Sequence, residues 1–336
     1  MVKKNIFYLR ILIDSWKLVW RNKLLWFFGL FSFILGKGVW CNFTSDSFSG
    51  VFKQGGIIFN LAKIGIFNNS FLNNLKNAML SDWFSFFMII FIFLLIIFIF
   101  IILIFVSAIG QGGLVYSIFK LDKKEKINIH DGISIGRRNF WRILSLNIIE
   151  KYIIWTLSFF LATLTVLGLA KKSSSIIIWS FIFLILITVV LIICSLIMKY
   201  ALAFVVLKGK NPIASIKEGI ILFYKNYIVN FEIAFFLFVI NYIFKYIMIL
   251  MAIILLVPLT RTFEGFSLYM FGGFSFDFYF VFIPCLLIFF VLSFISILVS
   301  YNYSVWTLMF VRLNNNKRIN KGAISNLIGN FKKSRL

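Results

Sequence analysis

Four polar or ionisable residues interrupt stretches that are otherwise apolar, and these are the positions where chemistry could occur. Lys245 follows Asn241 by four residues, so the two side chains share one face of a helix. Glu232 lies near the beginning of the same apolar run, and Glu150 lies near the beginning of another one. A charge in apolar surroundings is costly, and such groups commonly mark ion or substrate paths, proton relays or internal ion pairs. The sequence therefore indicates a candidate polar site formed by Lys245, Asn241, Glu150 and Glu232.

Each of these residues also has a structural interpretation. Glu150 and Glu232 are close enough to the ends of their runs to reach polar surroundings, and this is the favoured interpretation for both. Lys245 could be a functional group, one half of a structural ion pair, or a sign that its apolar segment is broken. The charges of Glu150, Lys151, Glu232 and Lys245 sum to zero, so pairing among them is also open.

The other reactive residue types form no recognisable constellation. His130, the single histidine, stands beside Asp131, an arrangement that could supply a base but is more typical of a solvated polar pair. Cys41, Cys194 and Cys285 are far apart and lack the spacing of metal ligands. We therefore expect no catalytic residues, no metal and no cofactor, and the chain is not expected to be an enzyme.

The elements that must position these residues are membrane-spanning helices. The chain is 62% hydrophobic, with a mean hydropathy of +1.00, whereas soluble domains are about 45–50% apolar. The apolar runs are continuous rather than alternating, and about 20 such residues cross a bilayer. The sequence predicts an all-α integral membrane fold with six spans, at about 24–41, 83–109, 152–170, 176–198, 228–257 and 279–300.

The net charge of +23 gives the orientation and the expected partner. If the N-terminus is cytoplasmic, the inner segments hold 25 Lys and Arg residues and the outer segments hold 7, as the positive-inside rule requires. Both termini are then cytoplasmic. Because the bases lie between apolar runs, we expect anionic membrane lipid as the partner, with a protein partner open and no nucleic acid. The abundance of Phe, Ile, Asn and Lys is typical of an AT-rich bacterial genome, so a bacterial plasma (inner) membrane is expected.

The sharpest pattern is a triplet that precedes three of the predicted spans. An acid is followed seven residues later by a base and eight residues later by Asn, which places acid and base on one helix face. Asn tolerates the left-handed conformation that often ends a helix. The pattern predicts a short helix on the cytoplasmic surface, a break at Asn, and a turn into the membrane. The copies are Asp14-Arg21-Asn22, Asp131-Arg138-Asn139 and Glu218-Lys225-Asn226.

These triplets organise the chain into three units, each an in-plane amphipathic helix followed by a hairpin of two spans. The approximate repeats are 1–122, 123–210 and 211–316, within one membrane domain at 1–316 and ahead of a basic cytoplasmic tail at 317–336. Each predicted hairpin ends on a base, at Lys120, Lys208 and Arg312. The alternative is that juxtamembrane helices in an Asn-rich and Lys-rich chain share such residues by chance.

Several of these segments together resemble a known family. They are Trp16 to Trp26 with Arg21-Asn22, Gly110-Gln111-Gly112-Gly113, Asp131-Gly132 to Arg138-Asn139-Phe140-Trp141, and Glu218-Gly219 to Lys225-Asn226. They look like a family of bacterial six-span membrane proteins that includes the membrane domain fused ahead of some glycerophosphodiester phosphodiesterases. No hydrolase domain follows the spans in this sequence. The resemblance implies a membrane module, and it carries over no catalytic residue.

Three functions are compatible with this organisation. The first is a non-enzymatic, lipid-interacting scaffold or accessory module, which the basic surfaces and in-plane helices favour. The second is a transporter or lipid-translocating subunit, which internal repeats and an intramembrane Lys245 would favour. The third, an intramembrane enzyme, ranks last because no polar constellation is evident.

Overall fold

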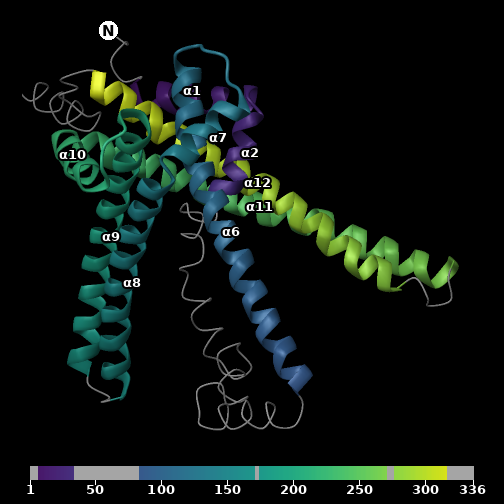
Figure 1. Ribbon diagram of the computed structural model, residues 1–336. Helices are drawn as coiled ribbons and strands as arrows, with labels where there is room; N and C mark the ends of the chain where they lie inside the picture. The colour runs from purple at the N-terminus through teal and green to yellow at the C-terminus, as the bar shows by residue number, and fades with distance from the viewer. Residues whose placement is uncertain (1–6, 34–82, 171–173, 271–275, 316–336) are drawn as a thin grey trace, which may run out of the picture. The chain divides into compact units, whose positions relative to one another are not determined.

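The computed structural model describes residues 7–33, 83–170, 174–270 and 276–315, and these contain helices and no strand (Figure 1). Long apolar runs with few Gly or Pro residues favour this, because a helix satisfies its backbone hydrogen bonds internally. The helices are α1 (Phe7–Arg21), α2 (Leu24–Ser32), α6 (Trp83–Asp122), α7 (Ile129–Arg138), α8 (Phe140–Ala170), α9 (Ser174–Lys208), α10 (Pro212–Lys225), α11 (Tyr227–Met270) and α12 (Phe276–Asn315).

The chain divides into two compact units. The larger unit combines residues 1–32 with residues 108–336, and the smaller unit comprises residues 33–107. The described part of the smaller unit is the first portion of α6, from Trp83 to Ser107, where large apolar side chains are exposed along the helix. The final turns of α6, from Ala108 to Asp122, belong to the larger unit.

Five helices among the described residues are long and apolar enough to cross a membrane, which is the property of a multi-pass membrane protein. These candidate spans are Ile90–Asp122, Phe140–Leu167, Ile178–Lys208, Tyr227–Met251 and Cys285–Asn314. They correspond to five of the six predicted spans. Of the predicted span at 24–41, the structure describes α2 and Phe33, and residues 34–41 lie outside the described residues, as does Cys41. That span stays a prediction.

The long helices extend beyond the predicted ends of their spans. Spans predicted to end at residues 109, 198 and 300 continue as helix to Asp122, Lys208 and Asn315. At 1.5 Å per residue the 35 residues of α9 measure about 52 Å, well beyond a hydrocarbon layer of about 30 Å. Protein rather than lipid covers the additional turns, so hydropathy alone could not set the helix lengths.

These additional turns form the core of the larger unit. Leu114 of α6, Tyr200 of α9 and Val305 of α12 are fully buried in one apolar cluster that also includes Ile11 of α1 and Phe28 of α2. Within this unit α8 lies beside α9, and α11 lies beside α12 (Figure 1). The core therefore joins the first two helices of the chain to the last one.

Candidate functional site

Three Asn residues separate a short helix from a long or buried one. α1 ends before Asn22, α7 before Asn139 and α10 before Asn226, and a new helix begins within two residues of each. Each side-chain amide donates to the backbone carbonyl four residues earlier, over 2.9 Å for Asn22, 3.2 Å for Asn139 and 3.3 Å for Asn226. The helix ends predicted at these Asn residues are confirmed, and we call the three positions the Asn breaks.

The predicted reason for these breaks was wrong. Asn139 has φ −102° and Asn226 has φ −131°, so neither adopts the left-handed conformation. Among the described non-glycine residues, Lys124 alone has a positive φ. The side chain ends the helix instead, because its amide satisfies a terminal carbonyl that would otherwise lack a partner. The Asn carbonyl also accepts an amide of the following helix, such as Ile143 N–H at 3.0 Å from Asn139.

The acid of each triplet forms an ion pair with a base that follows or ends a long helix. Asp131 on α7 lies 3.1 Å from Lys120 Nζ at the end of α6. Asp14 on α1 lies 3.2 Å from Arg312 Nη2 near the end of α12. No ion pair joins either acid to the base seven residues further on among the described residues, although the two share a helix face.

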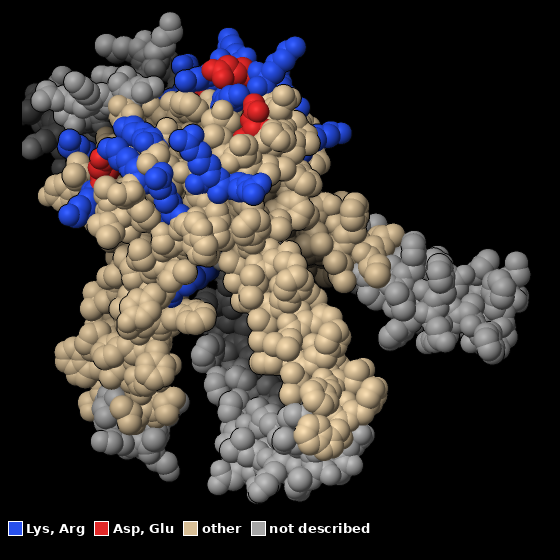
Figure 2. All heavy atoms as spheres, in the orientation of Figure 1, with Lys and Arg blue, Asp and Glu red and all other residues tan. Residues whose placement is uncertain are grey.

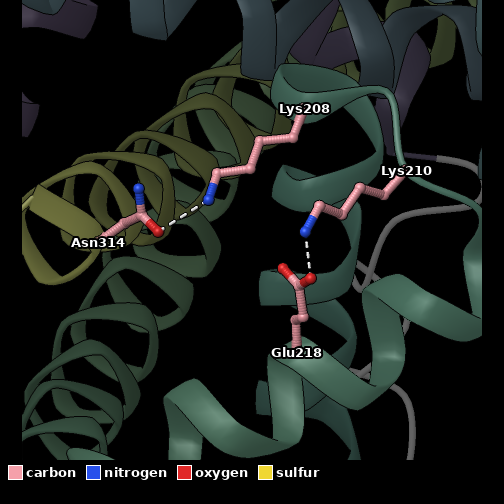
Figure 3. A network of polar contacts seen from close by, with 4 residues as sticks. All are labelled: Lys208, Lys210, Glu218 and Asn314. Atoms are coloured by element: carbon pink, nitrogen blue, oxygen red, sulfur yellow. Dashed lines mark hydrogen bonds and ion pairs between the residues drawn. The ribbon is translucent and has the colours of Figure 1, made fainter.

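The ion pair near the end of α9 is formed by Lys210 and not by Lys208, the base at the predicted end of that hairpin. Lys210, two residues beyond the end of α9, pairs with Glu218 on α10, whereas Lys208 donates to Asn314 Oδ1 over 3.0 Å (Figure 3). Gly209 explains the change, because its φ of +64° ends α9 and redirects the chain. Arg142 Nη1 donates to the Gly209 carbonyl over 2.8 Å and holds this turn.

The three ion pairs occur in a cyclic order. The end of α6 contacts α7, the segment after α9 contacts α10, and the end of α12 returns to α1. Arg312 also lies 3.8 Å from Asp122 at the end of α6, so one guanidinium joins three helices. The last long helix is thereby closed onto the first short helix, 298 residues earlier in the chain.

A small buried residue follows each paired acid and allows close helix crossing. These residues are Ser15, Gly132 and Gly219. A Cβ added at Gly132 would come within 2.6 Å of the Phe28 ring, and one at Gly219 within 3.0 Å of the Ile197 carbonyl. A Cβ at Gly112 would lie 2.8 Å from Gly136 Cα, so α6 and α7 also cross closely.

The base before each Asn break is exposed. Arg21, Arg138 and Lys225 form no ion pair within the described part of the chain. An exposed aromatic side chain lies within two residues of each break; the exposed fractions are 55% for Trp20, 77% for Trp141 and 79% for Tyr224. Figure 2 shows Lys and Arg gathered over the short helices on the face in view, while the long helices there carry almost no charge.

No hydrogen bond or ion pair among the described residues joins Asn241 or Lys245 to Glu150 or Glu232. Asn241 instead forms a reciprocal amide pair with Asn302 of α12, over 3.1 and 2.9 Å. Lys245 is half-buried and makes no hydrogen bond or ion pair with any described residue, so it is joined to neither glutamate. Glu150 and Glu232 are buried within the larger unit rather than exposed at its surface, and Glu150 lies within electrostatic reach of Tyr303.

Sequence reasoning missed two buried polar pairs between helices. Asn147 of α8 donates to Gln111 Oε1 of α6 over 2.8 Å, and the Tyr200 hydroxyl of α9 donates to Asn230 of α11. The signal for them was present, since Asn147 and Asn230 stand within two turns of an Asn break at the beginning of an apolar helix. Both pairs hold neighbouring long helices together near the ion-paired end.

No other candidate residues gather into a chemical site. His130 is exposed beside the ion-paired Asp131, Cys194 is half-buried and Cys285 is exposed. No group of three His, Cys, Asp or Glu residues that could hold a metal occurs among the described residues. In comparisons with known proteins, no protein family, no curated protein and no solved structure matches this chain. Over the residues that the structure describes, the fold and site define a helical membrane protein with five candidate spans. The short helices α1, α7 and α10, with the three Asn breaks and the ion-paired ends of the long helices, form what we call the basic end.

Proposed function

We propose that this chain is a non-enzymatic, lipid-interacting membrane module, a scaffold or accessory subunit that gathers anionic lipid, and with it a partner, at one membrane surface. The observation that carries this proposal is that acids at the basic end form ion pairs, whereas most bases there remain exposed. Asp14, Asp122, Asp131 and Glu218 all form ion pairs. Most bases nearby remain exposed, so the surface is cationic and suits anionic headgroups.

The proposal includes a membrane arrangement. Six spans in three hairpins, each preceded by an in-plane amphipathic helix, would place the basic end and both termini in the cytoplasm of a bacterial cell, at its inner membrane. The positive-inside distribution of Lys and Arg supports this orientation. The recurrence of the Asn break and the ion-paired acid supports three related units, in line with the family that the sequence resembles.

The test is extraction of the full chain from native membranes in polymer nanodiscs, followed by lipid analysis of the purified particles. The module predicts anionic phospholipid enriched over the bulk membrane, because the exposed bases outnumber the acids around them. Particles with the bulk lipid composition would contradict the proposal. Discs formed around an unrelated multi-pass protein of low net charge provide the control for lipid recruited by the polymer itself.

A second candidate function, a transporter or lipid-translocating subunit, rests on Lys245. This side chain is half-buried within the candidate span Tyr227–Met251, one turn from the Asn241–Asn302 pair. A transporter predicts that Lys245→Leu abolishes flux while the helix content is retained. The lipid-interacting module predicts that Lys245→Leu leaves lipid enrichment unchanged, so the two functions separate in one variant.

A further inference from the structure

We infer that each Asn break is a separate binding position for the phosphate of an anionic phospholipid headgroup, with the preceding base as the direct contact. This inference rests on the proposed lipid interaction and assigns it to three residues, Arg21, Arg138 and Lys225. All three are exposed and stand one residue before an Asn break. The alternative is a diffuse cationic surface in which every exposed base contributes equally.

The availability of these three bases follows from the ion pairing of the acids. The acid of each triplet, the nearest carboxylate on the same helix for Arg21 and Lys225, is paired with a base beyond that helix. The break Asn is equally occupied, since its amide caps the preceding helix. The base is therefore the one side chain of each triplet that remains available to a ligand.

The local environment of the breaks favours a headgroup. The helix that begins after each break presents amide groups without intrahelical carbonyl partners, which adds positive potential beside the base. The exposed aromatic rings of Trp20, Trp141 and Tyr224 flank the bases. Rings of this kind are typical of the headgroup level of a bilayer, where one edge is apolar and the other is hydrated.

The exposed apolar residues on the same helices identify the occupant as membrane lipid rather than a soluble anion. Leu9 and Ile13 are about half exposed on α1, and Ile213 and Ile220 are exposed on α10. A free phosphate gains nothing from such neighbours, whereas a phospholipid brings acyl chains that cover them. Base, aromatic ring and apolar side chain together match the three parts of an anionic lipid at the bilayer surface.

The test compares two triple variants that lose the same charge. The break variant is Arg21→Gln, Arg138→Gln and Lys225→Gln. The matched control changes three exposed bases away from the breaks, Lys17→Gln, Lys126→Gln and Lys217→Gln. Each full-length protein is reconstituted in phosphatidylcholine nanodiscs, and association of spin-labelled phosphatidylglycerol is measured against spin-labelled phosphatidylcholine.

The inference predicts that the break variant loses most of the preference for phosphatidylglycerol, because the affinity at each break falls about fivefold when its base is removed. The control variant should keep the preference. Equal losses in both variants would overturn the inference but leave the proposed function intact. A wild-type protein without any preference would overturn both. Circular dichroism and the conservative variant Arg21→Lys, Arg138→Lys, Lys225→Arg, which should retain the preference, exclude misfolding as the cause.

A competition experiment separates lipid from soluble phosphate. Inorganic phosphate added to wild-type discs, matched for ionic strength with chloride, should leave the association of spin-labelled phosphatidylglycerol unchanged. Displacement by phosphate beyond the chloride control would show that the breaks bind a free anion, and it would overturn the assignment to lipid.

Discussion

The ion pairs of Arg312 complete the cyclic series of contacts between the helices. Replacing Arg312 should therefore loosen the packing of α1 more than any other charge change at the basic end. Its guanidinium lies 3.2 Å from Asp14 and 3.8 Å from Asp122, with side-chain exposures of 29% for Arg312, 38% for Asp14 and 25% for Asp122. Fully exposed pairs contribute about 0.2–1 kcal/mol, and removing one partner of a fully buried pair costs about 3–5 kcal/mol. The pairs of Arg312 are partly buried, so their contribution to stability should lie between these two ranges.

We expect Arg312→Gln to lower the free energy of unfolding by about 2 kcal/mol, because it leaves two partly buried carboxylates close together without a counter-charge. In a double-mutant cycle with Asp14→Asn, the coupling energy should be about 1 kcal/mol, since Asp122 remains as a second partner of Arg312. Unfolding is measured by titration of the detergent-solubilised protein with dodecyl sulfate and followed by circular dichroism. Arg21→Gln is the control and should change stability by less than about 0.5 kcal/mol.

The structural change caused by Arg312→Gln should be confined to α1. Hydrogen exchange should accelerate in α1, because Asp14 is the charged contact that ties this helix to α12. Exchange in α8, which carries neither Arg312 nor its two partners, should not change. A coupling energy indistinguishable from zero, or unchanged protection of α1, would refute the argument that Arg312 closes the ring.

Three further predictions concern the stability of the larger unit. Gly112→Ala should destabilise the protein by about 1–3 kcal/mol, because its Cβ would lie 2.8 Å from Gly136 Cα. Gly209→Ala meets no atom closer than 3.9 Å but has φ +64°, so it should cost about 1 kcal/mol, and Gly209→Asn should cost less. Replacing Asn241 or Asn302 singly by Leu takes away the amide partner of the other residue, although Asn302 keeps its bond to the Leu298 carbonyl. Each single variant should therefore be less stable than the double variant in dodecyl sulfate titration.

The local part of this structure could be predicted from the sequence. The acid–base–Asn spacing located the ends of α1, α7 and α10 to the residue, because a helix end depends on a few neighbouring residues. The way in which Asn ends each helix could not be predicted. Asn can end a helix through its backbone conformation or through its side chain, and the sequence does not distinguish these two. The φ values of Asn139 and Asn226 and the amide contacts show that the side chain does so.

The ion pairs could not be predicted, because they depend on which helices meet. The sequence showed three acids on predicted short helices and three bases at predicted hairpin ends, but it did not show which would pair. Pairing between Asp14 and Arg312 requires contact between helices 298 residues apart, which no local pattern encodes. The shift from Lys208 to Lys210 depends on the turn at Gly209. Burial of Glu150 and Glu232 likewise depends on which helices pack around them, whereas the sequence favoured contact with polar surroundings for both.

The cyclic order of the ion pairs explains why so much positive charge remains exposed. Asp131 and Glu218 pair with bases earlier in the chain, whereas Asp14 pairs with Arg312 of the last long helix. Through this contact between α12 and α1, every acid of the triplets is neutralised by a base beyond its own short helix. The bases that precede the Asn breaks therefore have no available acid within their own triplets. With the triplet acids paired elsewhere, Arg21, Arg138 and Lys225 remain exposed, and this is the feature on which the proposed interaction with anionic headgroups rests.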